Sequence, residues 1–196
     1  MPRRRGRPID IQTARFRLRS LIPVDVTERW LKWSADPEVM GPLNAPVAPM
    51  TRRDLEAYIA GFDNSNGYLV GIFTRPENRL IGFYMISVER PHAVASFNVL
   101  IGDKAYWGQK VINETRAALL DLLFAERGVE KAYGRPLARN FPAVFNYQAQ
   151  GWKLEGVLRG QVKSVTDGSR LDQYQFGMLA SDWLARKKES TSHEQP

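Results

Sequence analysis

The sequence predicts an α+β domain in which one mixed, mostly antiparallel sheet packs against helices. Segments 68–74, 79–89 and 93–102 are rich in β-branched and aromatic residues and are separated by turn sequences, as in an antiparallel meander. Residues 111–124 carry apolar side chains near helical spacing, which predicts a helix that packs one face on the sheet. WKLEGVLRGQVKS and LDQYQFGMLA, on either side of VTDGSR, predict a closing hairpin.

The remaining elements follow in order along the chain. RFRLRSL (15–21) alternates apolar residues with arginines, which predicts a half-buried first strand. Two helices are expected next, one over the apolar cluster of residues 26–36 and one opened by a capping box at residues 51–54. Residues 129–136 predict a short strand, and residues 141–150 predict a helix that a glycine ends.

The length and the charge pattern predict one domain with polar ends. We expect residues 13–186 to form the domain, residues 1–12 a basic flexible arm and residues 187–196 a polar tail. The net charge of +7 arises mainly at the N-terminus, because residues 1–20 hold seven arginines and one aspartate. Residues 21–184 hold 18 charges of each sign. We therefore expect no nucleic-acid partner except through the arm, and a solvated terminus is the commoner explanation of such a basic segment.

The composition excludes several classes of protein. Without cysteine, the chain has no disulfide framework, no thiolate zinc site and no cysteine nucleophile. Only two histidines are present, which argues against a multi-histidine metal site, and we expect no metal. No apolar run approaches the roughly 20 residues of a membrane-spanning helix, and no secretory signal follows the basic N-terminus. We therefore expect a cytoplasmic protein that does not contact a membrane.

Five short stretches follow one another in order along the chain. They are DPEV after the first helix, YWG…E at 106–114, RGVEK at 127–131, N…YQAQGW at 140–152 and EGVLR…D at 155–172. Together they resemble the GNAT superfamily of acyl-coenzyme A N-acyltransferases, and within it the RimJ/RimL-like branch. The resemblance implies a three-layer fold whose splayed central sheet has helices on both faces. It also implies acetyl-CoA as co-substrate and a primary amine as acceptor.

The resemblance also implies where coenzyme A binds. The strand before the long helix would carry a bulge and splay from the next strand, leaving a slot for the pantetheine arm. The pyrophosphate would meet the following turn and the helix N-terminus, where N–H groups and the helix dipole favour anions. Asn140 matches the asparagine that opens the second coenzyme motif, with a structural cap as the alternative. The expected coenzyme contacts are Val99, Leu100, Ile101, Gly108, Gln109, Lys110, Val111, Ile112, Asn113 and Asn140.

Two positions of the phosphate turn depart from the family pattern, which reads approximately Tyr-Trp-Gly-Lys-Gly-Ile-(Ala/Gly)-Thr-Glu. The chain keeps YWG and Glu114 but carries Lys110 and Ile112. With a negative φ, Lys110 would keep its N–H on the phosphate and add a point charge. Ile112 would crowd the approach of the pyrophosphate. The alternative is that both residues extend a well-packed helix and that coenzyme binding has been weakened or lost.

Acyl transfer to an amine needs an oxyanion donor, an acid and a base. The resemblance assigns the oxyanion to a backbone N–H at or near Val99. It assigns protonation of the departing sulfur to Tyr147, for which a core tyrosine is the alternative. The usual acidic base looks to be replaced by Ser96, so another carboxylate is needed, and we take Glu114 as the catalytic candidate. The other carboxylates considered are Glu89 and Asp103, and an ordinary surface or capping role is the alternative for all three.

Several functions remain open from the sequence alone. The leading hypothesis is transfer of an acetyl group from acetyl-CoA to a protein N-terminus or a small-molecule amine. A second enzyme hypothesis is an amino-sugar N-acetyltransferase that acts on a nucleotide-linked sugar. The non-enzyme hypothesis is a catalytically degenerate, acyl-CoA-binding GNAT-like domain. A homodimer is also left open.

Overall fold

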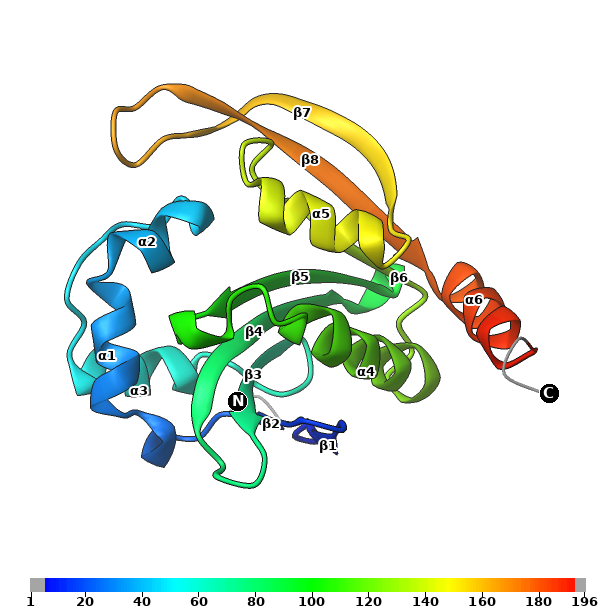
Figure 1. Cartoon of the computed structure of the whole chain (residues 1–196), viewed down its shortest axis with the longest axis horizontal. Helices are drawn as coiled ribbons and strands as arrows, with labels where there is room; N and C mark the ends of the chain where they lie inside the picture. The colour runs from blue at the N-terminus through cyan, green and yellow to red at the C-terminus, as the bar shows by residue number, and fades with distance from the viewer. Residues whose placement is uncertain (1–5, 193–196) are drawn as a thin grey trace.

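An eight-stranded sheet forms the centre of the molecule, which the computed structural model describes over residues 6–192 (Figure 1). The strands are β1 (Asp10–Gln12), β2 (Phe16–Ser20), β3 (Gly67–Thr74), β4 (Leu80–Glu89), β5 (Val94–Ile101), β6 (Lys131–Gly134), β7 (Lys153–Lys163) and β8 (Arg170–Leu179). Their order across the sheet is β1-β2-β3-β4-β5-β6-β8-β7. Neighbouring strands are antiparallel except β5 and β6, which are parallel.

Helices cover both faces of this sheet. They are α1 (Glu28–Ser34), α2 (Pro37–Met40), α3 (Arg52–Ala60), α4 (Val111–Glu126), α5 (Phe141–Ala149) and α6 (Ala180–Ser192). Side chains alternate between the faces of a strand, so Val70 and Ile72 of β3 pack in the cluster that includes α4 and α5. Leu69 and Phe73 pack in a second cluster, with α1 and α3. The predicted fold class is confirmed: a mixed, mostly antiparallel sheet lies between two layers of helices.

Local sequence signals account for several helix ends. The capping box expected at residues 51–54 is present, because Asp54 N donates to Thr51 Oγ1 (3.2 Å) and Thr51 N donates to Asp54 Oδ2 (2.8 Å). Asn140 caps α5 through Ala143 N (3.2 Å). These side chains satisfy N–H groups that have no partner within their own helix.

The N-terminal residues that the structure describes are part of the fold. β1 pairs with β2 in an antiparallel ladder, Ile9 is buried, and Arg127 donates to the backbone oxygen of Arg7 (2.9 Å). The prediction of a flexible arm over residues 1–12 is therefore wrong for residues 6–12, because a three-residue strand is too short to give a sequence pattern. Residues 1–5 of the predicted arm lie outside the described residues.

The predicted polar tail also begins inside a helix. α6 starts at Ala180 and continues to Ser192, so residues 187–192 are helical. Trp183 packs into the core and its Nε1 donates to Asp121 of α4 (2.7 Å). The first six residues of the predicted polar tail thus continue α6, and residues 193–196 lie outside the described residues.

β5 and β6 separate soon after they meet. Three residues of β5, Val94 to Ser96, pair with β6, whereas β5 pairs with β4 along its whole length. The expected splay is therefore present. The bulge expected in β5 is absent, since the β4–β5 register runs without interruption. The gap opens instead because β6 ends at Gly134, and Pro136, two residues later, has no N–H for a ladder.

Candidate active site

The free part of β5 presents backbone groups to the gap left by β6. Along a strand, successive residues direct their N–H and C=O groups to opposite neighbours. The oxygen of Ala93 accepts hydrogen bonds from residues 130 and 131 on the β6 side, and Gly102 N donates to the β4 side. By this alternation the N–H and C=O of Val99 face the gap.

The alternation also tests the neighbouring predictions. Leu100 turns its backbone groups toward β4 and buries its side chain in the cluster with α1 and α3, so it presents neither to the gap. Ile101 faces the gap, but its oxygen already accepts a hydrogen bond from Trp107 Nε1 (2.8 Å). Of the three strand residues expected in the slot, Val99 is the one whose N–H and C=O both remain for a ligand.

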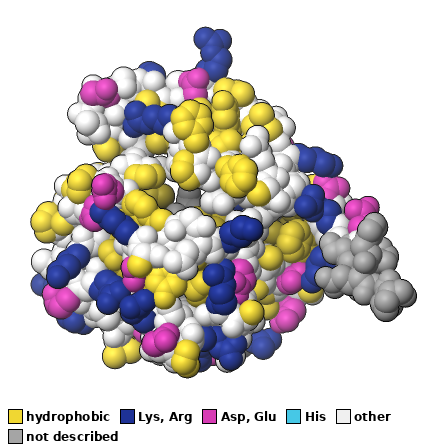
Figure 2. Space-filling view, in the orientation of Figure 1, with side chains coloured by type: hydrophobic (Ala, Val, Ile, Leu, Met, Phe, Trp, Pro, Cys, Tyr) yellow, Lys and Arg dark blue, Asp and Glu magenta, His cyan; other side chains and the backbone are white. Residues whose placement is uncertain are grey.

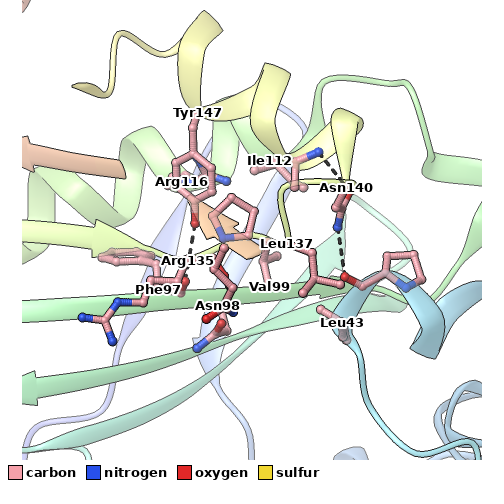
Figure 3. A pocket seen from close by; sticks show the side chains of 14 residues that line it. Leu43, Phe97, Asn98, Val99, Ile112, Arg116, Arg135, Leu137, Asn140 and Tyr147 are labelled. Atoms are coloured by element: carbon pink, nitrogen blue, oxygen red, sulfur yellow. Dashed lines mark hydrogen bonds between the residues drawn. The ribbon is translucent and has the colours of Figure 1, made fainter. Parts of the chain in front are cut away.

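A cavity of about 110 Å³ lies in this gap. Figure 3 shows it bordered by β5, α4, α5 and the loop that follows β6. Its lining includes Phe97, Asn98, Val99, Ile112, Arg116 and Tyr147. The structure therefore brings together four of the predicted site residues, Val99, Ile112, Asn140 and Tyr147, from a strand, two helices and the N-cap of α5.

Tyr147 points its hydroxyl from α5 toward β5. The side chain is buried, and its hydroxyl donates to the oxygen of Phe97 over a long 3.5 Å (Figure 3). Its ring stacks on Phe176 with 5.2 Å between centroids. A side chain at Gly134 would overlap the hydroxyl, so glycine at the end of β6 makes room for it. Burial raises the pKa of Tyr147, although the charge of Arg116 opposes this rise, and the phenol therefore stays protonated at neutral pH.

Arg116 is a site residue that the sequence reasoning missed. It is 1% exposed, and its guanidinium carbon lies 4.1 Å from the centre of the Tyr147 ring. The helical spacing could have indicated it. Arg116 lies three and four residues before Leu119 and Leu120, which places it on the buried face of α4. A charge buried on the apolar face of a helix is costly unless an opposite charge or hydrogen bonds compensate it.

The phosphate turn has the backbone of a glycine-rich turn. Gly108 has φ +73° and Lys110 has φ +56°, so the expectation of a negative φ at Lys110 is wrong. The turn keeps the left-handed conformation that glycine adopts freely, although lysine occupies the position. Lys110 is the N-cap of α4 and gives it no side-chain cap. The first N–H groups of α4 therefore remain available for an anion.

The other residues predicted around this turn have mixed placements. Val111 is buried in the core, and the side chain of Ile112 lines the cavity. The backbone oxygens of Gln109 and Asn113 accept hydrogen bonds from Arg15 (3.0 Å) and Gln150 (2.8 Å). The side chain of Ile112 therefore narrows the slot between β5 and α5, and not the phosphate turn.

Glu114 is held by the turn between β1 and β2, away from the cavity. Thr13 Oγ1 donates to its Oε1 (2.6 Å), and Arg15 Nε donates to its Oε2 (2.7 Å). Burial acts to raise the pKa of Glu114, but the hydrogen bonds from Thr13 and Arg15 outweigh it and hold that pKa below its usual value. This geometry favours a structural carboxylate, and the structure does not bring Glu114 to Tyr147.

The remaining carboxylate candidates do not line the cavity either. Asp103 pairs with Arg29 (2.8 Å) and accepts from Ala105 N (3.2 Å). Glu89 is exposed at the end of β4. Ser96, in the position of the usual base, is half-buried within the β5–β6 pairing.

Asn140 borders the cavity but has two structural partners. Besides capping α5, it donates from Nδ2 to the oxygen of Pro42 (3.1 Å), which ties α5 to the segment after α2 (Figure 3). These two partners favour the structural alternative for Asn140.

A second cavity of about 430 Å³ is lined by Asn140 together with Arg139, Val165 and the segment after α2. Figure 2 shows a hollow in the same region, with hydrophobic side chains around it.

The comparison with protein families decides the identity. A family model described as the acetyltransferase (GNAT) domain matches residues 15–151. The chain belongs to the GNAT acetyltransferase family. This confirms the family and the enzyme class expected from the sequence, an acetyl-CoA-dependent N-acetyltransferase. The match spans the phosphate turn and also β5, α4 and α5, which contribute residues to the cavity of this GNAT domain.

Solved structures share the fold of this GNAT domain. A spermidine N-acetyltransferase from Vibrio cholerae, in complex with CoA and spermine, has a TM-score of 0.75 at 20% identity and covers 86% of this chain and 98% of its own. A ribosomal-protein-S5-alanine acetyltransferase from Vibrio fischeri has a TM-score of 0.72 at 14% identity, covering 89% and 98%. A putative acetyltransferase from T. thermophilus has a TM-score of 0.75 at 24% identity, covering 97% and 99%. The search of curated proteins found no match.

Within residues 6–192, no helix has the length and apolar character needed to span a membrane. No cluster of three or more His, Cys, Asp or Glu side chains in that part of the chain could hold a metal ion.

Proposed function

We propose that this GNAT domain transfers the acetyl group of acetyl-CoA to a primary amine, with Tyr147 as the general acid and the Val99 N–H as the oxyanion donor. One observation carries the proposal: a protonated phenol and a free strand N–H face the same cavity, where β5 and β6 separate. A thioester between them would have a donor on its carbonyl oxygen and an acid near its sulfur.

The bonds in this reaction follow directly. The nitrogen of a neutral amine attacks the thioester carbon, and the carbonyl oxygen carries the negative charge of the tetrahedral intermediate. The C–S bond then breaks, and the sulfur takes a proton from the Tyr147 hydroxyl. The new amide nitrogen releases one proton to water, from which Tyr147 is reprotonated. No covalent enzyme intermediate is needed.

The turn before α4 is proposed to hold the pyrophosphate of coenzyme A. Gly108 and Lys110 give it two left-handed residues, and α4 contributes 16 residues of helix dipole with an open N-terminus. The ammonium group of Lys110 is exposed and adds a positive charge there. Ile112 makes the slot narrower than the usual small residue would, and we propose that coenzyme binding is retained despite this.

The acceptor is proposed to be an α-amine, such as a protein N-terminus. No carboxylate lines either cavity among the described residues, so the amine must lose its proton without a nearby base. An α-amine has a pKa near 8 and is about a tenth neutral at pH 7, whereas a lysine side chain with pKa near 10.4 is almost fully charged.

The charge of the cavity walls also bears on the acceptor. Arg116 and Arg135 line the first cavity and Arg139 lines the second, with no acidic residue beside them in either lining. Like charges repel, so a polycation such as the spermine of the Vibrio cholerae complex fits these walls poorly. The same arginines favour an amine attached to an anionic group, which keeps a nucleotide-linked amino sugar as the second candidate.

The proposal is tested by binding first and by turnover second. The melting temperature is measured with and without acetyl-CoA, because ligand at 100 times its dissociation constant adds about 2.7 kcal/mol to the stability. Thiol release from acetyl-CoA is then followed with a peptide that has a free N-terminus, and the same peptide with a blocked N-terminus is the control. The absence of both a melting-temperature shift and thiol release would favour a degenerate domain. A shift without release would limit the failure to the acceptor.

A further inference from the structure

Arg116 is a buried cation on the cavity wall that the proposed mechanism does not use. Its side chain lies beside the Tyr147 ring (Figure 3) and is 1% exposed. The guanidinium carbon is 4.1 Å from the centre of the Tyr147 ring and 5.5 Å from that of Trp152. Ring contacts of this kind attract the cation but take none of its N–H groups.

Two nitrogen atoms of the Arg116 side chain lack acceptors. Nε and Nη1 have no hydrogen-bond partner among the described residues, and no carboxylate of residues 6–192 forms an ion pair with the side chain. Burial raises the pKa of the neighbouring Tyr84 to about 12, even though the charge of Arg116 acts to lower it. The Tyr84 hydroxyl therefore stays neutral and gives Arg116 no counter-charge. Side-chain oxygens of Asn113 and Gln150 also lack partners. Water between the helices would satisfy such groups but would supply no negative charge.

A buried charge without a counter-charge points to a ligand. Charges inside proteins are paired, because their desolvation is costly. A guanidinium binds carboxylates and phosphates through two parallel hydrogen bonds. The phosphates of coenzyme A are an unsuitable partner, since Arg116 lies six residues after Lys110 and therefore about 9 Å further along the helix axis. The anion must reach the cavity itself.

We propose that Arg116 binds a carboxylate at the far end of the acyl group, so that the enzyme accepts coenzyme A thioesters of short dicarboxylic acids in addition to acetyl-CoA. The inference rests on the proposed function, which places the thioester between the Tyr147 hydroxyl and the Val99 N–H. From there the acyl chain extends into the cavity beside Arg116. The cavity volume of about 110 Å³ leaves room beyond a methyl group, since about 10–15 Å³ already accommodates a water molecule.

Transfer from such a thioester makes and breaks the same bonds as acetyl transfer. The amine nitrogen joins the thioester carbon, the C–S bond breaks, and the sulfur takes its proton from Tyr147. The amine releases one proton to water. The distal carboxylate stays ionised on Arg116 and does not react, so the product is an amide that carries a free carboxylate. An acetyl group would leave the guanidinium unpaired, and the carboxylated donor should therefore bind more tightly.

The test compares four ligands of the full chain by titration calorimetry: coenzyme A, acetyl-CoA, butyryl-CoA and succinyl-CoA. Butyryl-CoA matches the four-carbon length of succinyl-CoA without its carboxylate. We expect succinyl-CoA to bind at least ten-fold more tightly than butyryl-CoA. Equal or weaker binding of succinyl-CoA, with normal binding of coenzyme A, would overturn this inference alone. Failure of all four to bind would overturn the proposed function and this inference together.

Variants then locate the charge that is responsible. Arg116→Met keeps the length of the side chain and should bring succinyl-CoA to the level of butyryl-CoA, with coenzyme A affinity within three-fold of the original. Arg135→Met removes an exposed cation from the same cavity and should keep the preference. Should Arg116→Met fail to fold, Arg116→Lys retains the charge without the paired geometry and should lower the preference several-fold. A preference that survives loss of the guanidinium would refute the role of Arg116.

Discussion

For Tyr147, a packing role and an acid role predict different effects on turnover when the hydroxyl is removed. Tyr147→Phe keeps the stacking on Phe176 and removes a hydroxyl whose bond to Phe97 is long. We expect turnover to fall by about 10²-fold or more, the scale of positioned acid catalysis, while acetyl-CoA affinity and melting temperature change little. Steady-state kinetics and calorimetry measure the two effects.

A matched control separates acid chemistry from the loss of any phenol. Tyr133→Phe makes the same chemical change on β6, where the side chain is half-buried and outside the cavity. It should leave turnover within about two-fold. A Tyr147→Phe enzyme that also retained turnover within a few-fold, at a cost of about 1 kcal/mol in stability, would instead identify Tyr147 as a core residue.

Lys110 occupies a backbone conformation that suits glycine. A non-glycine residue in the left-handed region costs about 1–2 kcal/mol, so Lys110→Gly should raise the free energy of unfolding by about 1 kcal/mol. Chemical denaturation measures the change. Gln109→Gly is the control, because Gln109 is not among the residues with positive φ and glycine there should stabilise nothing. Equal effects at the two positions would mean that the turn relaxes around Lys110.

At the scale of the elements, Glu114 fastens the start of α4 to the turn between β1 and β2. The pKa of Glu114 is lower in the folded chain than in the unfolded one, so its contribution to stability is present above the unfolded pKa, near 4.3. That contribution is lost as the pH falls through the lower folded value. Glu114→Gln should therefore reduce stability at pH 7 and flatten its decline below about pH 5. Denaturation curves at a series of pH values measure this, and an unchanged slope would mean that the tether contributes little.

The elements also show what could be predicted from the sequence. β3, β4, β5, α4 and α5 were predicted because each is long enough for its apolar period to appear. β1 and α2 have three and four residues, too few for a period. Whether Leu100 faces the gap or β4 depends on which residues of β5 bond to β4. Only the pairing of β5 with β4 fixes this. The partners of Glu114 come from residues about 100 positions away, so no local pattern announces them.

Considered as a whole molecule, the domain includes more of its N-terminus than the charge pattern suggests. Deletion of residues 1–12 removes β1 and the buried side chain of Ile9. Loss of a buried isoleucine costs about 2–5 kcal/mol, so the melting temperature should fall by several degrees. Deletion of residues 1–5 removes none of the contacts described above and serves as the control. Equal melting temperatures for the two deletions would mean that β1 adds nothing to the fold.

The single parallel ladder between β5 and β6 divides the sheet between two continuous pieces of chain. Every strand up to β5, with α1 to α4, precedes Arg127, and every strand from β6 onward, with α5 and α6, follows Glu130. The chain crosses this seam once, at residues 127–130. Two fragments cut there should therefore reassemble when co-expressed, as a split protein does. Because Val99 and Tyr147 belong to different fragments, acetyl-CoA should tighten their association, and reassembly that ignored the ligand would show that the thioester does not bridge the seam.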